Sequence, residues 1–225
     1  MGATALVSGG KDSIFAASLA DQQGVEVDEL LVLEPDDNES WMYHTPNLGL
    51  VRLQAEAWGK SFRSVRVPGP SSEADSERLE TALRTSSGPI VAGAIASSYQ
   101  WSRLLKVASR LNRRAYLPLW GKEAATVVRA EISAGLDIRI VHVAAEPLTP
   151  DLLGLRLDPD RLADLECRGR GKTPVNVAGE GGEYETLVVD APFFARRIVV
   201  ESAETVADGS AARWVVRSAH LAPKP

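Results

Sequence analysis

Cysteine is almost absent from this sequence, because Cys167 is the only one among 225 residues. A single thiol cannot form a disulfide within the chain, and it cannot supply a zinc site built from several cysteines. Proteins of oxidising compartments commonly rely on disulfides, so the composition favours a reducing, cytoplasmic setting. Disulfide-stapled secreted scaffolds and multi-cysteine zinc proteins are therefore excluded.

Long apolar runs and an excess of positive charge are also lacking. No stretch approaches the roughly 20 apolar residues that span a bilayer, and the N-terminus does not have the pattern of a signal peptide. The chain carries 25 basic and 30 acidic residues, which gives a net charge of −5. Nucleic-acid binders usually present a basic surface. We therefore expect neither a membrane nor a stable nucleic-acid partner.

The sequence does contain a regular alternation of apolar, β-prone runs and helical patterns. Five runs are apolar on both faces, and most are followed by a helix, which predicts a parallel sheet covered on both sides. Right-handed crossovers make such a sheet doubly wound. The expected fold is therefore α/β with a doubly wound, Rossmann-like, parallel five-stranded sheet. The expected strands are Ala3–Val7, Leu30–Leu33, Ser64–Val67, Pro89–Ala94 and Arg114–Leu117.

Helix signals lie between these strands. One helix starts at Lys11 and is stopped by Gly24, and Asn47 is expected to cap another that runs to about Trp58. A third ends near Arg84. Ser97 and Gln100 match a capping box for the fourth, and a fifth helix covers about residues 122–134. Ligands of doubly wound sheets bind beyond the carboxyl ends of the strands, so the site is expected there.

The regular alternation of strand and helix patterns ends after the run Leu136–Val143. The segment 146–164 is rich in proline and leucine, and further β-type runs follow it. We therefore expect a nucleotide-binding domain over residues 1–121 and a smaller C-terminal α+β subdomain over residues 122–225. The later runs are Pro174–Ala178, Tyr184–Val189, Ile198–Ser202 and Arg213–Ala219.

The first strand leads into Ser8-Gly9-Gly10-Lys11-Asp12-Ser13 and then directly into a helix. Glycines let backbone N–H groups approach phosphate oxygens, and the helix N-terminus adds further donors. Lys11 offers a positive charge and the two serines offer hydroxyl groups. Asp12 suits either Mg²⁺ or a helix cap. The pattern predicts a phosphate site, and an ordinary strand-to-helix turn is the alternative.

Three glutamates crowd into Gly179-Glu180-Gly181-Gly182-Glu183-Tyr184-Glu185-Thr186. In an extended strand Glu183 and Glu185 point to one face, where the like charges call for a cation or a raised pKa. Mg²⁺ and an ammonium substrate are both suitable cations, and one glutamate could take a proton from ammonium. The alternative is a hairpin turn at Gly181-Gly182 flanked by solvated glutamates.

Smaller signals lie at the same expected edge of the sheet. Tyr43 and His44 follow the second strand, and Tyr99 and Gln100 follow the fourth. A loop histidine of this kind is often merely solvated. Gly93 allows a close approach of backbone or ligand.

These motifs together resemble archaeal-type diphthine–ammonia ligase, a family with the pyrophosphate loop of the ATP pyrophosphatases (adenine nucleotide alpha hydrolase-like fold). The resemblance covers nearly the whole chain. The Glu-Gly-Gly-Glu-Tyr-Glu-Thr run is its most specific part. The resemblance also rests on the motifs Ser8–Ser13, Met42-Tyr43-His44-Thr45, Val91-Ala92-Gly93-Ala94, Ser98-Tyr99-Gln100 and Trp120-Gly121.

The resemblance implies a reaction and its participants. ATP, with Mg²⁺, would adenylate the carboxylate of diphthine on elongation factor 2, and ammonium would then give the diphthamide amide with release of AMP and pyrophosphate. Lys11, Asp12, Glu183 and Glu185 would be catalytic. ATP would bind at Ser8, Gly9, Gly10, Lys11, Asp12, Ser13, Gly93 and Ala94, with Asp12 as the candidate Mg²⁺ ligand. The substrate or ammonium would contact Tyr43, His44, Tyr99, Gln100, Glu180, Glu183, Tyr184, Glu185 and Thr186.

The chain departs from similar proteins over residues 146–156, where Leu152 and Leu155 replace an expected tryptophan and arginine. Three alternatives therefore stay open. One is an amide ligase acting on a different carboxylate. A second is a sulfur-transfer enzyme of transfer RNA, which the lone cysteine and the acidic charge disfavour. The third is a nucleotide-binding module without chemistry. The oligomeric state also stays open, with a homodimer among the options.

Overall fold

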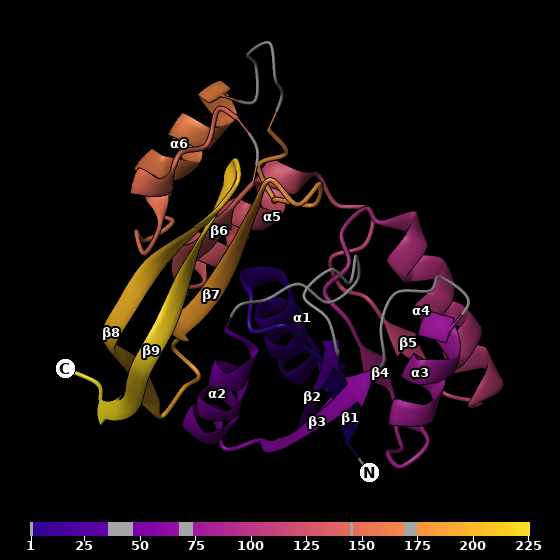
Figure 1. The fold of residues 1–225 in the computed structure, drawn as a ribbon. Coiled ribbons are helices and arrows are strands. Elements are labelled where there is room, and N and C mark those ends of the chain that lie inside the picture. The colour runs from indigo at the N-terminus through magenta and orange to yellow at the C-terminus, as the bar shows by residue number, and fades with distance from the viewer. Residues whose placement is uncertain (1, 36–46, 68–73, 145, 169–174) are drawn as a thin grey trace.

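The computed structural model describes residues 2–35, 47–67, 74–144, 146–168 and 175–225, and it contains two sheets (Figure 1). The first is a five-stranded parallel sheet in the order β3-β2-β1-β4-β5. The predicted doubly wound α/β fold is thereby confirmed. Its strands are β1 (Ala3–Leu6), β2 (Val27–Pro35), β3 (Ser61–Val67), β4 (Ile90–Val91) and β5 (Ala115–Tyr116).

The strand β2 shows why this sheet needs cover on both faces. Leu30 and Val32 belong to the apolar cluster on one face, whereas Leu31 and Leu33 belong to the cluster on the other. Successive side chains of a strand point to opposite faces. A continuous apolar run therefore stays out of water only when helices lie on both sides.

Helices α1 (Lys11–Gln22) and α2 (Val51–Trp58) cover one face of the parallel sheet, and the short helix η1 (Leu48–Leu50) leads into α2. Helices α3 (Ala74–Leu83) and α4 (Ser98–Arg110) cover the other face. Ser97 caps α4, because its side chain accepts a hydrogen bond from the Gln100 amide. The capping role predicted for Ser97 is confirmed.

The second sheet is antiparallel, has the order β7-β6-β9-β8 and forms the smaller α+β part of the chain. Helix α5 (Ala124–Ser133) precedes it, and η2 (Pro150–Leu152) and α6 (Pro159–Arg168) follow its first strand. Its strands are β6 (Asp137–Val143), β7 (Tyr184–Asp190), β8 (Arg196–Asp208) and β9 (Ala211–Pro223).

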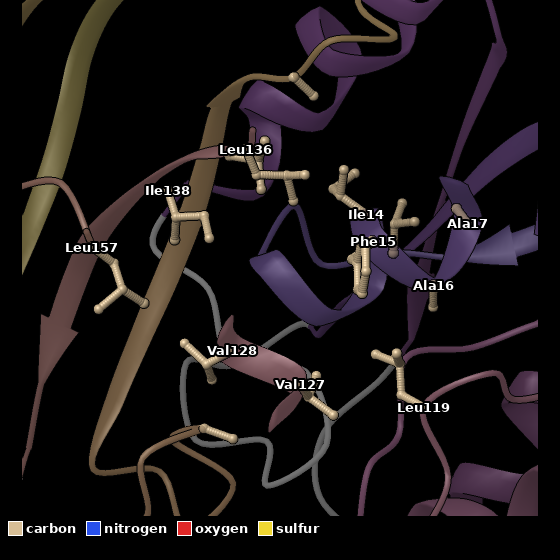
Figure 2. Close-up of a cluster of buried hydrophobic side chains, with 14 of the residues drawn as sticks. Ile14, Phe15, Ala16, Ala17, Leu119, Val127, Val128, Leu136, Ile138 and Leu157 are labelled. Carbon is tan, nitrogen blue, oxygen red and sulfur yellow. The ribbon is translucent and has the colours of Figure 1, made fainter. Parts of the chain in front are cut away.

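Helix α1 joins the two sheets. Its side chains Ile14 and Phe15 lie in one cluster with Val127 and Val128 of α5 and Ile138 of β6 (Figure 2). The same helix contacts β1, β2 and β4 of the parallel sheet and β7 of the antiparallel sheet. The segment Ser8–Ser13, called the phosphate segment below, leads into α1 and is therefore held in place by both sheets.

Asn47 does not cap a helix as the sequence predicted. Its side-chain amide donates to the Trp214 carbonyl at 2.9 Å and accepts from the Val216 amide at 3.0 Å. A primary amide offers one donor group and one acceptor, so Asn47 satisfies two backbone groups of β9. The start of α2 is thus tied to the antiparallel sheet.

Residues 175–178, the described part of the predicted strand Pro174–Ala178, form no strand. Their backbone groups bond to side chains: Val177 accepts from the Tyr184 hydroxyl and Ala178 from Lys11 Nζ. The Asn176 side chain also accepts from the Ala178 amide. The hairpin interpretation of Gly181-Gly182 required a strand on this side and is wrong.

Helix α6 was missed because the proline-rich segment 146–164 predicts irregular structure. Asp158 accepts a hydrogen bond from the Arg161 amide at 2.9 Å, which is an N-cap, and Pro159 follows it in the first helical turn. Leu162 and Leu165 are buried three residues apart. None of the helices in the described part of the chain is long and apolar enough to cross a membrane.

Candidate active site

A cavity of about 690 Å³ opens where the carboxyl ends of β1 and β4 meet the antiparallel sheet. Its lining includes apolar residues of the parallel sheet, the start of α1, the turn 178–182 and parts of β6, β7 and β9. Most of the predicted site residues line it. These are Ser8, Gly10, Lys11, Asp12, Ser13, Gly93, Ala94, Gln100, Glu180, Tyr184, Glu185 and Thr186.

Three predicted residues of the described part of the chain are placed differently. Gly9, Tyr99 and Glu183 do not line the cavity, and Tyr99 is 37% exposed on α4. Tyr43 and His44 lie outside the described residues. The phosphate segment and the glutamate segment (Gly179–Thr186) are about 170 residues apart in the chain. They nevertheless come together at one site.

The phosphate segment folds as a compact turn held by its own serines. The Ser13 hydroxyl donates to the Gly10 carbonyl at 3.0 Å and accepts from the Ser8 amide at 3.2 Å. Gly9 has a φ of +85°, a conformation that favours glycine. The first-turn amides of α1 have no acceptor within the helix, so this helix end offers donors and partial positive charge to an anion.

Strand β7 is joined to this turn by hydrogen bonds. The Lys11 amide donates to Thr186 Oγ1 at 3.1 Å, and the Val188 amide donates to the Gly9 carbonyl at 3.0 Å. Gln54 of α2 is fully buried and donates to the carbonyls of both Gly9 and Val188. Gln54 was not predicted. A glutamine on the apolar face of a helix was the available signal.

Lys11 is buried, with 1% of its surface exposed. Its Nζ lies 2.8 Å from both carboxylate oxygens of Asp12 and 2.7 Å from the Ala178 carbonyl. Burial is the largest single influence and would lower the pKa of Lys11. The charge and hydrogen bond of Asp12, together with the charges of Tyr184 and Glu131, outweigh it, and the pKa is raised. Lys11 thus stays protonated, and it links the phosphate segment to Ala178, which directly precedes the glutamate segment.

Glu131 of α5 is a buried acid that sequence reasoning missed. It is fully buried, and its side chain hydrogen-bonds to that of Asp12. Burial and the neighbouring Asp12 carboxylate raise its pKa well above the usual range. The available signal was an acid three residues after Val128, on the inward face of the helix.

The three glutamates of the glutamate segment have separate partners. Glu180 accepts a hydrogen bond from the Ala96 amide at 2.9 Å. Glu183 accepts from the amides of Asn176 and Gly181, both at 3.0 Å. Backbone donors therefore relieve much of the expected repulsion, and Glu183 shapes the turn from outside the cavity.

Glu185 lies in the cavity wall beside two residues that were not predicted, His142 and Arg213. Glu185 Oε1 is 3.6 Å from His142 Nδ1. His142 pairs with Glu185 across β6 and β7, and with Arg213 across β6 and β9. A single histidine within the otherwise apolar end of β6 was the available signal.

The short helix η2 and the rest of the segment 146–156 lie outside this cavity. Gly154 packs against the Trp214 indole, and its amide donates to the Ile140 carbonyl at 2.8 Å. Leu148 and Leu152 are buried. Within the part of the chain that the structure describes, no group of three or more histidine, cysteine or acidic side chains has the arrangement of a metal site.

Family models match both parts of the chain. Residues 1–115 match the diphthamide synthase N-terminal domain, and residues 124–220 match the diphthamide synthase C-terminal domain. Together these matches account for most of the 225 residues.

Curated proteins named diphthine–ammonia ligase are similar to this chain over most of its length. The protein of Rattus norvegicus is 34% identical and that of Homo sapiens 33%, each alignment covering 92% of this chain and 85% of the relative. The Schizosaccharomyces pombe protein is 33% identical over 91% of this chain and 37% of its own length. A solved structure titled as a predicted subunit of tRNA methyltransferase from Methanocaldococcus jannaschii has a TM-score of 0.48 at 16% identity, covering 85% of this chain and 97% of that one.

Proposed function

From the premise that the chain belongs to the diphthamide synthase family and is a ligase, we propose that it adenylates the carboxylate of diphthine on elongation factor 2 with ATP. Ammonium then aminates the acyl-adenylate to give diphthamide, and AMP and pyrophosphate are released. The reaction is proposed to take place in the cytoplasm, with residues 1–121 binding ATP and residues 122–225 binding the acceptor.

One observation carries this proposal. A single cavity is lined both by the helix start at Ser8–Ser13, whose donors suit an anion, and by the carboxylates of Glu180 and Glu185. A nucleotide module without chemistry would have no use for the second group. Cys167 is exposed on α6 and does not line the cavity, so the sulfur-transfer alternative loses its sulfur carrier.

The chemistry requires both halves of the cavity. A free carboxylate is a poor acyl donor, and adenylation gives it AMP as a leaving group. Stabilising the charge on the departing pyrophosphate accelerates this step. The backbone amides and serine hydroxyls at Ser8–Ser13 are proposed to do so, with Gly93 and Ala94 against the nucleotide. The charge of Lys11 is already paired with Asp12, so we propose that Lys11 holds the loop in shape.

The Asp12 side chain is 27% exposed at the cavity. A single carboxylate combined with phosphate oxygens is a common way for proteins to hold Mg²⁺, so Asp12 suits this ion. When bound, Mg²⁺ would offset phosphate charge. Gln100, Glu180, Tyr184, Glu185 and Thr186 are proposed to surround the acceptor or ammonium, together with Tyr43, His44 and Tyr99. Glu183 is proposed to act through the turn that it stabilises.

The test is an assay of the full chain with ATP, ammonium chloride and elongation factor 2 that carries diphthine. We expect AMP and pyrophosphate in amounts equal to the amide, measured by chromatography and by mass spectrometry of the factor. Formation of ADP and phosphate would contradict the adenylate. Absence of turnover with this factor would contradict the acceptor.

Two variants sharpen the assay. Asp12→Asn removes the carboxylate that faces the phosphates, and we expect kcat to fall by about 100-fold. Cys167→Ser is the control, and its activity should equal that of the unmodified chain. Loss of activity in Cys167→Ser would favour the sulfur-transfer alternative.

A further inference from the structure

Glu185, His142 and Arg213 form a row across three neighbouring strands. In the strand register, His142 on β6 lies opposite Glu185 on β7 and opposite Arg213 on β9. All three line the cavity that also contains the phosphate segment. The row therefore presents a carboxylate, an imidazole and a guanidinium, in that order, to one ligand space.

The row contains polar atoms that lack partners. His142 is 9% exposed, and neither of its ring nitrogens has a hydrogen-bond partner within the described residues. Glu185 Oε2 is buried and likewise has no partner there. An unsatisfied buried polar atom destabilises the folded state. Such a group at a cavity wall indicates a position that a polar ligand fills.

The side chains of this row favour a ligand that is small and donates hydrogen bonds. A carboxylate only accepts hydrogen bonds, and a neutral imidazole accepts at one nitrogen. A ligand that satisfies both must donate to both, and the negative charge of Glu185 favours a cation. Arg213 repels a cation from the opposite side of His142, which directs it toward Glu185. Ammonium carries only donors and is small enough to fit between them.

The other acids do not offer this site. Glu180 and Glu183 already accept hydrogen bonds from backbone amides. Glu131 does not line the cavity and lies against Asp12. Among the acids of the described residues, Glu185 thus combines a position at the cavity with an unpartnered oxygen and an adjacent imidazole.

We propose that Glu185 and His142 form the ammonium subsite of this enzyme, with His142 as the proton acceptor, an inference that rests on the proposed function. Ammonium bound to Glu185 transfers one proton to the imidazole nitrogen. The lone pair of the resulting ammonia forms the C–N bond with the acyl carbon. The C–O bond to AMP breaks and its electron pair leaves with the AMP phosphate oxygen. The nitrogen then loses a second proton to solvent.

The test separates adenylation from amination in the full chain. Exchange of labelled pyrophosphate into ATP, with diphthine-bearing elongation factor 2 and no ammonium, reports adenylation alone. Amide formation at increasing ammonium chloride gives the KM for ammonium. For Glu185→Gln and His142→Gln we expect this KM to rise, or kcat/KM to fall, by about tenfold or more. The exchange rate should fall far less than the kcat/KM of amination, because the subsite acts after adenylation.

Matched controls exist on the same sheet. Glu201 and His220 form a half-exposed pair on β8 and β9, outside the cavity. Glu201→Gln and His220→Gln repeat the same changes there, and both reactions should keep their rates. Retained exchange in the Glu185→Gln and His142→Gln variants would also show that they fold.

Hydroxylamine distinguishes a proton acceptor from a structural residue. It is largely uncharged at neutral pH and needs no base to become a nucleophile. With hydroxylamine in place of ammonium, His142→Gln should form hydroxamate within about twofold of the unmodified rate, while its amide formation stays about tenfold lower.

Two results would overturn the subsite. One is a kcat/KM for ammonium within about twofold of the unmodified value in both cavity variants. The other is loss of pyrophosphate exchange in Glu185→Gln, which would place Glu185 in adenylation. Absence of exchange in the unmodified chain would instead overturn the proposed function, and the subsite with it.

Discussion

Gly93, which follows β4, lies directly against the start of α1. A Cβ atom at this position would lie 2.6 Å from the backbone carbon and oxygen of Asp12 and 2.7 Å from the Ser13 nitrogen. These are backbone atoms of α1 and cannot rotate away. The glycine is therefore required by the close approach of two chain segments, one of the two roles that the sequence left open.

We predict that Gly93→Ala displaces the start of α1 and lowers the free energy of unfolding by about 2 kcal/mol. Nucleotide affinity should fall as well, because the donors for phosphate move. Urea unfolding and titration with a non-hydrolysable ATP analogue measure the two effects. Gly49→Ala is the control, since a Cβ there meets nothing within 4 Å. Equal behaviour of the two variants would refute this account.

Gln54 acts at the scale of elements, because it connects α2, the phosphate segment and β7. Its Nε2 lies 2.9 Å from the Gly9 carbonyl and 2.7 Å from the Val188 carbonyl. We predict that Gln54→Glu costs about 3 kcal/mol at neutral pH, because a carboxylate would face two carbonyl oxygens without a donor. Thermal unfolding would measure this. Gln22→Glu at the exposed end of α1 should change stability by less than about 0.5 kcal/mol.

The pairing of β2 with β3 gives a prediction for pH. Arg63 donates to both carboxylate oxygens of Glu29, which lies on the neighbouring strand, and this hydrogen bonding lowers the pKa of Glu29 below its usual value. A lowered carboxyl pKa stabilises the folded state above the unfolded pKa of about 4.5. This contribution is lost as the pH falls through the folded value.

We therefore predict that Glu29→Gln loses about 1 kcal/mol at pH 7. The difference from the unmodified chain should shrink once the pH falls below about 4. Urea midpoints at several pH values would measure it. A deficit that is independent of pH would show that the pair contributes packing and not charge.

At the scale of the whole molecule, ligand and fold are coupled, because the cavity is lined by both sheets. A ligand that binds only the folded state at 100 times its Kd adds about 2.7 kcal/mol of stability. We predict that an ATP analogue raises Tm and slows hydrogen exchange in both α1 and β7, since the Val188 amide bonds to Gly9. Protection confined to α1 would indicate that β7 does not respond to nucleotide.

The five parallel strands and the phosphate segment could be predicted from the sequence because their signals are local. Continuous apolar runs indicate strands buried on both faces, and Ser97 sits directly before the helix that it caps. The glutamate segment was found by its composition. Its partners could not be found. Glu180 bonds to an amide distant in sequence, Glu183 bonds to amides of an unexpected turn, and Glu185 lies beside a histidine of another strand.

The sequence by itself thus determined the class of fold and the family to which the chain belongs, and it predicted that Ser8–Ser13 binds phosphate. Only the tertiary structure decided that Lys11 is paired and buried, that Glu131 lies against Asp12, and that His142 stands between Glu185 and Arg213. The physical reason is the distance along the chain over which each kind of interaction acts. Periodicity, capping and turn chemistry act over a few neighbouring residues, whereas strand register and the docking of α1 between two sheets decide which distant charges meet.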